Sequence, residues 1–217
     1  MNQWGKKAEL YQAYFEDNDN RVSSKKVFPG ILKIIGDVSN KKILDFGCGQ
    51  GRFSRVFHDM GAHVYAYDNA QQEIEIACSL NNGRDIKYSF NNEIFMNQCD
   101  YDLVWCFMAL LCNPHEDVLD IIKKIYNCLK TNGFACFVNT NTETLGFRFQ
   151  DFYSIPPDNL MNGSPYKTII PTSKGEIEVT DYYYSPEHLR DVFLSNNFEI
   201  VNETVFSKQF IFHLLQK

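Results

Sequence analysis

The sequence lacks an apolar run of membrane-spanning length, a block of lysine and arginine, and paired cysteine spacings. Its first residues are polar and charged, so we expect no signal peptide and no membrane association. The net charge of −6 disfavours nucleic acid as the main partner, because phosphate neutralisation needs a basic face. The seven cysteines are scattered singly. We therefore expect reduced thiols, no metal site and a cytoplasmic location.

The order of apolar and polar segments predicts one α/β domain. A chain of 217 residues with 44% hydrophobic content can bury a sizeable core. Short apolar runs alternate with amphipathic segments, which is typical of a doubly wound, mostly parallel sheet. The expected strands are 42–46, 63–67, 86–90, 101–107 and 134–139, and the expected helices are 51–60, 70–80 and 115–130.

The segment from Lys42 to Phe53 is the most informative part of the sequence. A strand ends near Asp45, and Gly47, Gly49 and Gly51 follow at every second position before a helix begins. Glycine allows a tight turn and lets a ligand approach the backbone beside a helix N-terminus. The spacing differs from G-x-G-x-x-G, because the sixth position is Arg52. A nucleotide-dependent oxidoreductase is therefore disfavoured.

A second strand, 63–67, ends in Asp68, whose carboxylate suits a ribose diol. Together with the glycine turn, this pattern resembles the cofactor site of class I S-adenosylmethionine-dependent methyltransferases. The resemblance extends over roughly residues 1–140. It includes Trp4, Tyr11, Tyr14, Asn18-Asp19-Asn20-Arg21, the strand 100–106 and the segment 129–138.

The resemblance implies a seven-stranded, Rossmann-like methyltransferase fold that binds S-adenosylmethionine. The backbone of 47–51, including Cys48, would pack on the methionyl part, Asp45 would meet its ammonium, and Asp68 would hold the ribose. The other cofactor residues that it implies are Asn69 and Asn92 near the adenine, Cys106 and Phe107 at the tip of the fourth strand, and Tyr11 and Tyr14 as a lid. Asn92 as an ordinary loop residue, Cys106 as a core residue and the two tyrosines as core residues remain alternatives.

Residues 141–184 interrupt the alternation of strands and helices. Turn signals at 156–157, 162–165 and 174–175 surround one alternating strand, 176–180. We interpret this stretch as an insertion that, with the N-terminal helices 6–16 and 25–36, forms a mobile cap over the carboxyl ends of the strands. Pro29-Gly30 is expected to break the second helix. The single domain then divides into 1–37 (helical cap), 38–140 (cofactor core), 141–184 (cap insertion) and 185–217 (helix and strands 198–205 and 209–216).

The cap insertion also supplies the candidate acceptor residues. In a strand through Asp181-Tyr182-Tyr183-Tyr184, Asp181 and Tyr183 would share one face. We predict Tyr153, Tyr166 and Tyr183 as substrate-binding residues, with ordinary aromatic packing as the alternative. Asp181 or His188 is the candidate catalytic base if the acceptor is a hydroxyl.

The sequence therefore predicts methyl transfer from S-adenosylmethionine to an oxygen or nitrogen of a small molecule. The segment Leu110-Leu111-Cys112-Asn113 lacks the histidine that many relatives carry there, and no aromatic Asn-Pro-Pro motif is present. The alternatives are a non-catalytic S-adenosylmethionine-binding partner or sensor, and a methyltransferase acting on protein or tRNA. The acceptor, the atom methylated and the choice between monomer and homodimer are left open.

Overall fold

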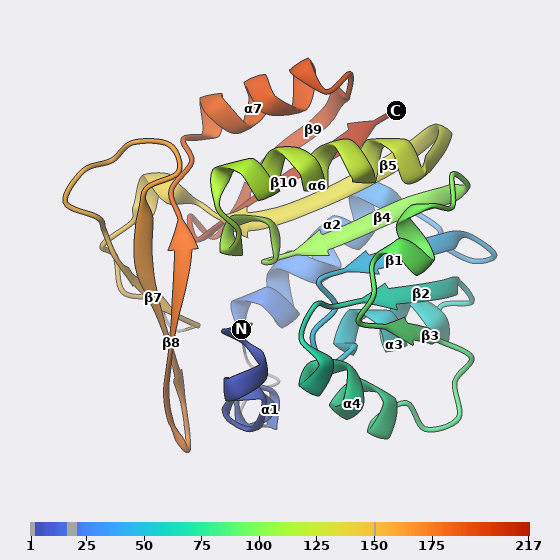
Figure 1. Ribbon diagram of the computed structural model, residues 1–217, viewed down its shortest axis with the longest axis horizontal. Coiled ribbons are helices and arrows are strands. Elements are labelled where there is room, and N and C mark those ends of the chain that lie inside the picture. Colours follow the sequence, from blue (N-terminus) through green and yellow to red (C-terminus); the bar gives the residue numbers. More distant parts are fainter. Residues whose placement is uncertain (1–2, 17–20, 150) are drawn as a thin grey trace.

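The computed structural model describes residues 3–16, 21–149 and 151–217, and it is built around a seven-stranded sheet (Figure 1). The strand order is β3-β2-β1-β4-β5-β10-β9, and β10 runs antiparallel to both of its neighbours. The mostly parallel sheet that the sequence predicted is thereby confirmed. The bounds are β1 Lys42–Phe46, β2 His63–Tyr67, β3 Lys87–Ser89, β4 Tyr101–Phe107, β5 Leu129–Thr140, β9 Glu199–Phe206 and β10 Phe210–Gln216.

Helices cover both faces of this sheet, because each has an apolar stripe at helical spacing. In α6 (His115–Cys128), for example, Val118, Ile122 and Ile125 are buried. One face carries α5 (Glu93–Met96), α6 and α7 (Pro186–Ser195), and the other carries α2 (Phe28–Ile35) and α3 (Arg52–Asp59). The helix α4 (Gln71–Ser79) packs beside β3 and the N-terminal turn Gly5–Lys7.

The insertion forms a second sheet, of three antiparallel strands: β6 Tyr153–Ile155, β7 Pro165–Thr172 and β8 Gly175–Tyr182. The sequence predicted only the strand at 176–180, so β6 and β7 were missed. Along β8, Ile177, Val179 and Asp181 are buried and the residues between them are exposed. Figure 1 shows β7 and β8 standing at the end of the main sheet toward which β1 and β4 point. The insertion therefore lies at the carboxyl ends of the parallel strands.

The N-terminal segment departs from the prediction at the second helix. A π-helical turn, Ser23–Val27, continues directly into α2, so Pro29-Gly30 does not break the helix. Pro29 lies in the first turn of α2, where a missing N–H costs little. Gly30 lies against the ring of Phe206, where a Cβ would be 2.6 Å from Cε1. The first helix, α1, spans Ala8–Glu16, and the predicted motif residues 18–20 lie outside the described residues.

The end of the predicted helix 115–130 also shifts. The helix α6 stops at Cys128, and Leu129 is already extended. Asn132, at φ 60°, lies within β5 in an irregularity opposite Tyr101 and Leu103, so 131–133 is a bulge in this strand. The short helix α5 was not predicted. Within the described part of the chain, no helix has the length and apolar character needed to cross a membrane.

A buried polar cluster joins the N-terminal helices to the insertion. The Arg21 guanidinium lies over the Tyr14 ring and donates to the carbonyls of Tyr14, Asp151 and Pro171 at 3.2, 3.4 and 3.5 Å. The Asp151 carboxylate accepts from the backbone N–H groups of Val22 and Ser23 at 3.3 and 3.2 Å. Because Arg21 and Asp151 are buried, this cluster fixes the position of one part of the cap relative to the other.

Replacing Asp151 with alanine tests this connection. The change leaves the backbone N–H groups of Val22 and Ser23 without their carboxylate partner. We expect the free energy of unfolding to fall by about 2–4 kcal/mol. Urea denaturation of Asp151→Ala against exposed Asp158→Ala measures the effect. Equal stability of the two variants would show that the cluster contributes nothing.

Candidate functional site

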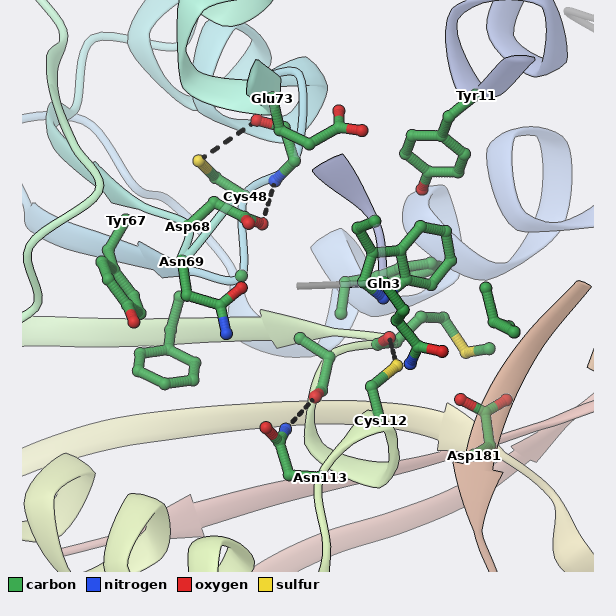
Figure 2. Close-up of a pocket in the computed structure, with 18 of the residues that line it drawn as sticks. Gln3, Tyr11, Cys48, Tyr67, Asp68, Asn69, Glu73, Cys112, Asn113 and Asp181 are labelled. Atoms are coloured by element: carbon green, nitrogen blue, oxygen red, sulfur yellow. Dashed lines mark hydrogen bonds between the residues drawn. The ribbon is translucent and has the colours of Figure 1, made fainter. Parts of the chain in front are cut away.

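A cavity of about 670 Å³ opens where the carboxyl ends of β1, β2 and β4 meet the second sheet. The glycine turn after β1 and the tip of β2 line one end, and β7, β8 and β10 line the other. Trp4 and Tyr11 from the N-terminal segment complete the wall. Figure 2 shows Asp68 and Glu73 at the first end and Asp181 at the second. The site is thus one continuous space with Asp68 and Glu73 at one end and Asp181 at the other.

The glycine turn at 47–51 has the conformation that its residues predict. Gly47, Gly49 and Gly51 all have left-handed φ values, of 73°, 50° and 71°. The N–H groups of Gly47 and Cys48 both donate to the carbonyl of Tyr67, at 2.8 and 2.9 Å. A Cβ on Gly47 would overlap that of Ala109. The turn is therefore held against the ends of both β2 and β4.

Asp68 connects this turn to the end of β2. Its Oδ2 accepts from Gly49 N at 2.9 Å, and its Oδ1 accepts from Ala70 N at 2.8 Å. Burial raises the pKa of the Asp68 carboxyl, although both backbone hydrogen bonds oppose the shift. Asn69 and Asn92 line the cavity nearby. The carboxylate is thus oriented by the backbone and lines the cavity.

Two further carboxylates lie at this end of the cavity. Asp45 accepts a hydrogen bond from the Ser54 hydroxyl, and burial raises its pKa to about 7. Glu73, in the first turn of α4, is 1% exposed, and burial together with the Asp68 charge raises its pKa to about 7. Neither Glu73 oxygen lies within hydrogen-bond geometry of a partner among the described residues, although the nearby Gln50 side chain, whose amide donates to the Ala8 carbonyl, partly opposes the rise in the Glu73 pKa.

Sequence reasoning missed Glu73, although a signal was present. With Ile74 and Ala77 it forms the buried stripe of α4, so a carboxylate occupies a position at which helix periodicity expects an apolar side chain. An acid on a buried stripe close to a predicted ligand site indicates a polar role.

The opposite end of the cavity combines one carboxylate with an apolar wall. Asp181 is 5% exposed, and its Oδ1 is buried without a hydrogen-bond partner in the part of the chain described. Burial raises the pKa of this carboxyl, while the Thr168 hydroxyl and the Cys112 thiol partly oppose the shift. The apolar lining at this end consists of Met108, Phe152, Ile170, Val179 and Phe210.

The N-terminal segment closes over the cavity through Gln3. Its side-chain amide donates to the carbonyl of Thr180 and accepts from the N–H of Thr180, both at 2.9 Å. This pairing imitates a neighbouring strand on the outer edge of β8. Trp4 and Tyr14 each pack against Tyr11, with ring centroids 5.2 and 5.5 Å away. The aromatic wall is therefore tied to the second sheet.

The structure brings most of the predicted site residues to this one cavity. Its lining includes Asp45, Gly47, Cys48, Gly49, Asp68, Asn69, Asn92, Phe107, Tyr11, Tyr14 and Asp181. Gly51 and Cys106 are not part of it. Gly51 begins α3 against the Tyr88 ring, and Cys106 is fully buried in the core, which is the alternative that the sequence left open.

The remaining predicted acceptor residues lie outside the cavity lining. Tyr166 pairs with Asp181 across β7 and β8 and is buried beside it. Tyr153 lies on β6 beneath the Arg148 guanidinium. Because β8 ends at Tyr182, the alternation expected for Tyr183 does not continue, and the Tyr183 backbone pairs with 163–164 instead.

His188 also lies away from the cavity. Its ring packs against His115 and Tyr184, with centroids 5.4 and 6.0 Å away. Burial and the His115 ring lower the pKa of His188. Of the two candidate bases, only Asp181 lines the cavity.

Comparisons with known proteins agree with this geometry. A family model described as a methyltransferase domain matches residues 19–203. N-demethylindolmycin N-methyltransferase of Streptomyces griseus is 26% identical over 65% of this chain and 62% of its own length. A ubiquinone biosynthesis O-methyltransferase of Vibrio parahaemolyticus is 24% identical over 83% of this chain and 82% of its own. This chain thus spans less than two thirds of the first of these relatives.

Solved structures share the fold. An S-adenosylmethionine-dependent methyltransferase from Mesorhizobium loti superposes with a TM-score of 0.68 at 16% identity, over 92% of this chain and 99% of that one. The likeness at this identity concerns the fold, namely the Rossmann-like arrangement of the seven-stranded sheet.

The unpartnered Glu73 predicts a pH-dependent gain in stability when its charge is removed. A carboxyl whose pKa rises on folding destabilises the fold above that pKa and costs nothing below its unfolded value. Without ligand, Glu73→Gln should therefore be more stable than the native chain at pH 8, by roughly 3 kcal/mol, and the gain should vanish near pH 4.5. Urea denaturation at both pH values measures this. A variant that is less stable at pH 8 would show that Glu73 has a stabilising partner.

Proposed function

Because this chain belongs to the methyltransferase-domain family, we propose that it transfers a methyl group from S-adenosylmethionine to an oxygen or nitrogen of a small molecule. One observation carries the proposal. A single cavity places a glycine turn and Asp68 at one end and an apolar wall with one buried carboxylate at the other. Such a space suits a nucleoside cofactor beside a partly apolar acceptor.

The residues present fit this cofactor. Asp68 is an oriented acceptor for the ribose hydroxyls, and Asp45 is an acceptor close to the glycine turn for the ammonium. Asn69 and Asn92 offer amides for the adenine edge. When bound, the cofactor supplies a methyl group that is already activated by its sulfonium. The chain therefore needs chiefly to orient the acceptor and to exclude water.

Asp181 is the residue that we assign to the acceptor. Because its pKa is raised, the Asp181 carboxylate takes up a proton more readily than an ordinary aspartate. Its Oδ1 has no hydrogen-bond partner among the described residues. With a hydroxyl acceptor, Asp181 would hold the hydroxyl group and take up its proton during methyl transfer. With an amine, the same carboxylate would hold the N–H and orient the lone pair. The apolar wall around it favours an acceptor with an apolar body. Roles for Tyr153, Tyr166, Tyr183 and His188 stay predictions.

The alternative functions have less support from the site. A non-catalytic sensor needs no acceptor space, whereas this cavity extends to Asp181. Methylation of tRNA or protein is disfavoured by the net charge of −6 and by the small, partly enclosed acceptor end.

In a cell extract supplied with S-adenosylmethionine labelled in its methyl group, the label should enter the small-molecule fraction. Label found only in RNA or protein would exclude the proposed acceptor class. We also propose a cytoplasmic location, with which the free cysteines accord, and a monomeric or homodimeric state.

The cofactor assignment predicts a loss of binding when Asp68 is truncated. Asp68→Ala removes hydrogen bonds to a charged group, so S-adenosylhomocysteine should bind about 10- to 100-fold more weakly. Isothermal calorimetry measures the affinity, with the exposed Asp85→Ala as the control. An unchanged dissociation constant in Asp68→Ala would refute the ribose assignment.

The acceptor assignment predicts a separate loss of turnover. Asp181→Asn keeps the size of the side chain but removes the base, so turnover of a hydroxyl acceptor should fall about 100-fold. The affinity for S-adenosylhomocysteine should change by less than about threefold, because Asp181 lies at the other end of the cavity. Release of S-adenosylhomocysteine in the presence of an accepted phenol or alcohol measures the rate. Full turnover in this variant would remove Asp181 as the base.

A further inference from the structure

Glu73 is a buried carboxylate that has no role in the proposed reaction. It lines the cavity, is 1% exposed, and neither of its oxygens has a hydrogen-bond partner among the described residues. A buried charge without a partner is costly, and carboxyl groups with pKa values perturbed in this way cluster at functional sites. Figure 2 shows the Glu73 carboxylate directed toward Tyr11 across the open space.

The surroundings of Glu73 contain negative and neutral groups. Burial raises the pKa of Glu73 and the Asp68 charge raises it further, while burial and, to a smaller extent, the Glu73 charge raise those of Tyr11 and Cys48. The Gln50 side chain, whose amide donates to the Ala8 carbonyl at 2.9 Å, partly opposes the rise in the Glu73 pKa. No salt bridge joins Glu73 to a lysine or arginine of the described residues. A cationic ligand would supply the charge that compensates the Glu73 carboxylate.

The position of Glu73 places it beside the glycine turn. A Cβ built on Gly49 would lie 4.0 Å from Glu73 Oε2 and 3.5 Å from Tyr11 Cε1. The same Gly49 donates its N–H to Asp68 at 2.9 Å. Glu73 and Asp68 therefore approach one residue of the turn, and both carboxylates face any ligand that packs on it.

We propose that Glu73 is a cofactor-binding residue whose negative charge makes the site prefer S-adenosylmethionine over S-adenosylhomocysteine. The inference rests on the proposed function. The two nucleosides share the ribose, the adenine and the methionyl ammonium, and they differ by the methyl group and the positive charge of the sulfonium. A carboxylate in a cavity of low dielectric attracts the charged form more strongly. Once the methyl group has left, the attraction weakens, which favours release of the product.

The test compares the affinities of both nucleosides for three proteins by calorimetry at pH 8. These are the native chain, Glu73→Gln and Glu75→Gln. Glu75 lies on the same helix, but it is exposed, accepts a hydrogen bond from Gln71 and does not line the cavity. Glu75→Gln therefore removes the same charge from a position outside the cavity. A cooperative unfolding transition of each unliganded variant confirms that it folds.

In Glu73→Gln, we expect S-adenosylmethionine to bind about 10-fold or more weakly. The preference for it over S-adenosylhomocysteine should fall by about fivefold or more. In Glu75→Gln, the preference should stay within about twofold of the native value, because the exposed charge is screened. An equal loss of affinity for both nucleosides in Glu73→Gln, or none, would overturn the inference while leaving the proposed function intact. A native chain that binds neither nucleoside would overturn both.

Discussion

The hydrogen bond between the Asp68 carboxylate and the Gly49 N–H is the interaction on which the site depends. It joins the end of β2 to the turn that follows β1, while the Tyr67 carbonyl holds the start of the same turn. The two strand ends therefore act as one unit. A left-handed backbone costs free energy for a residue with a side chain, so glycine adopts the conformation at position 49 most readily. The same bond orients the carboxylate that we assign to the ribose.

The second sheet supplies side chains that line the acceptor end of the cavity. Its strands β7 and β8 bring Thr168, Ile170, Val179 and Asp181 to the open end of the main sheet. The Gln3 amide on Thr180 and the Arg21–Asp151 cluster fix the N-terminal segment against this sheet. The cavity is thus enclosed by segments from both ends of the sequence. Enclosure strengthens every electrostatic interaction inside it, which is why the charges of Asp45, Glu73 and Asp181 matter.

The sequence predicted the central sheet and the cofactor end because their signals are local. The glycine spacing, the apolar strands and the acid at position 68 can each be recognised within a short window. The strands β6 and β7 were missed because their pairing depends on contacts with the cavity wall and the core, and no short window of sequence shows such contacts. Tyr183 was placed in the site by strand alternation with Asp181, and His188 by its position after the insertion, but β8 ends at Tyr182 and α7 turns His188 toward His115. Glu73 was missed although it shares the buried stripe of α4 with Ile74 and Ala77, whereas Glu75 is exposed.

A crystal structure with S-adenosylhomocysteine tests most directly whether one cavity holds both the cofactor and the acceptor. We expect the ribose hydroxyls to lie within hydrogen-bond distance of Asp68 and the sulfur to face the space leading to Asp181. A nucleoside bound elsewhere, or a sulfur that points away from Asp181, would contradict it.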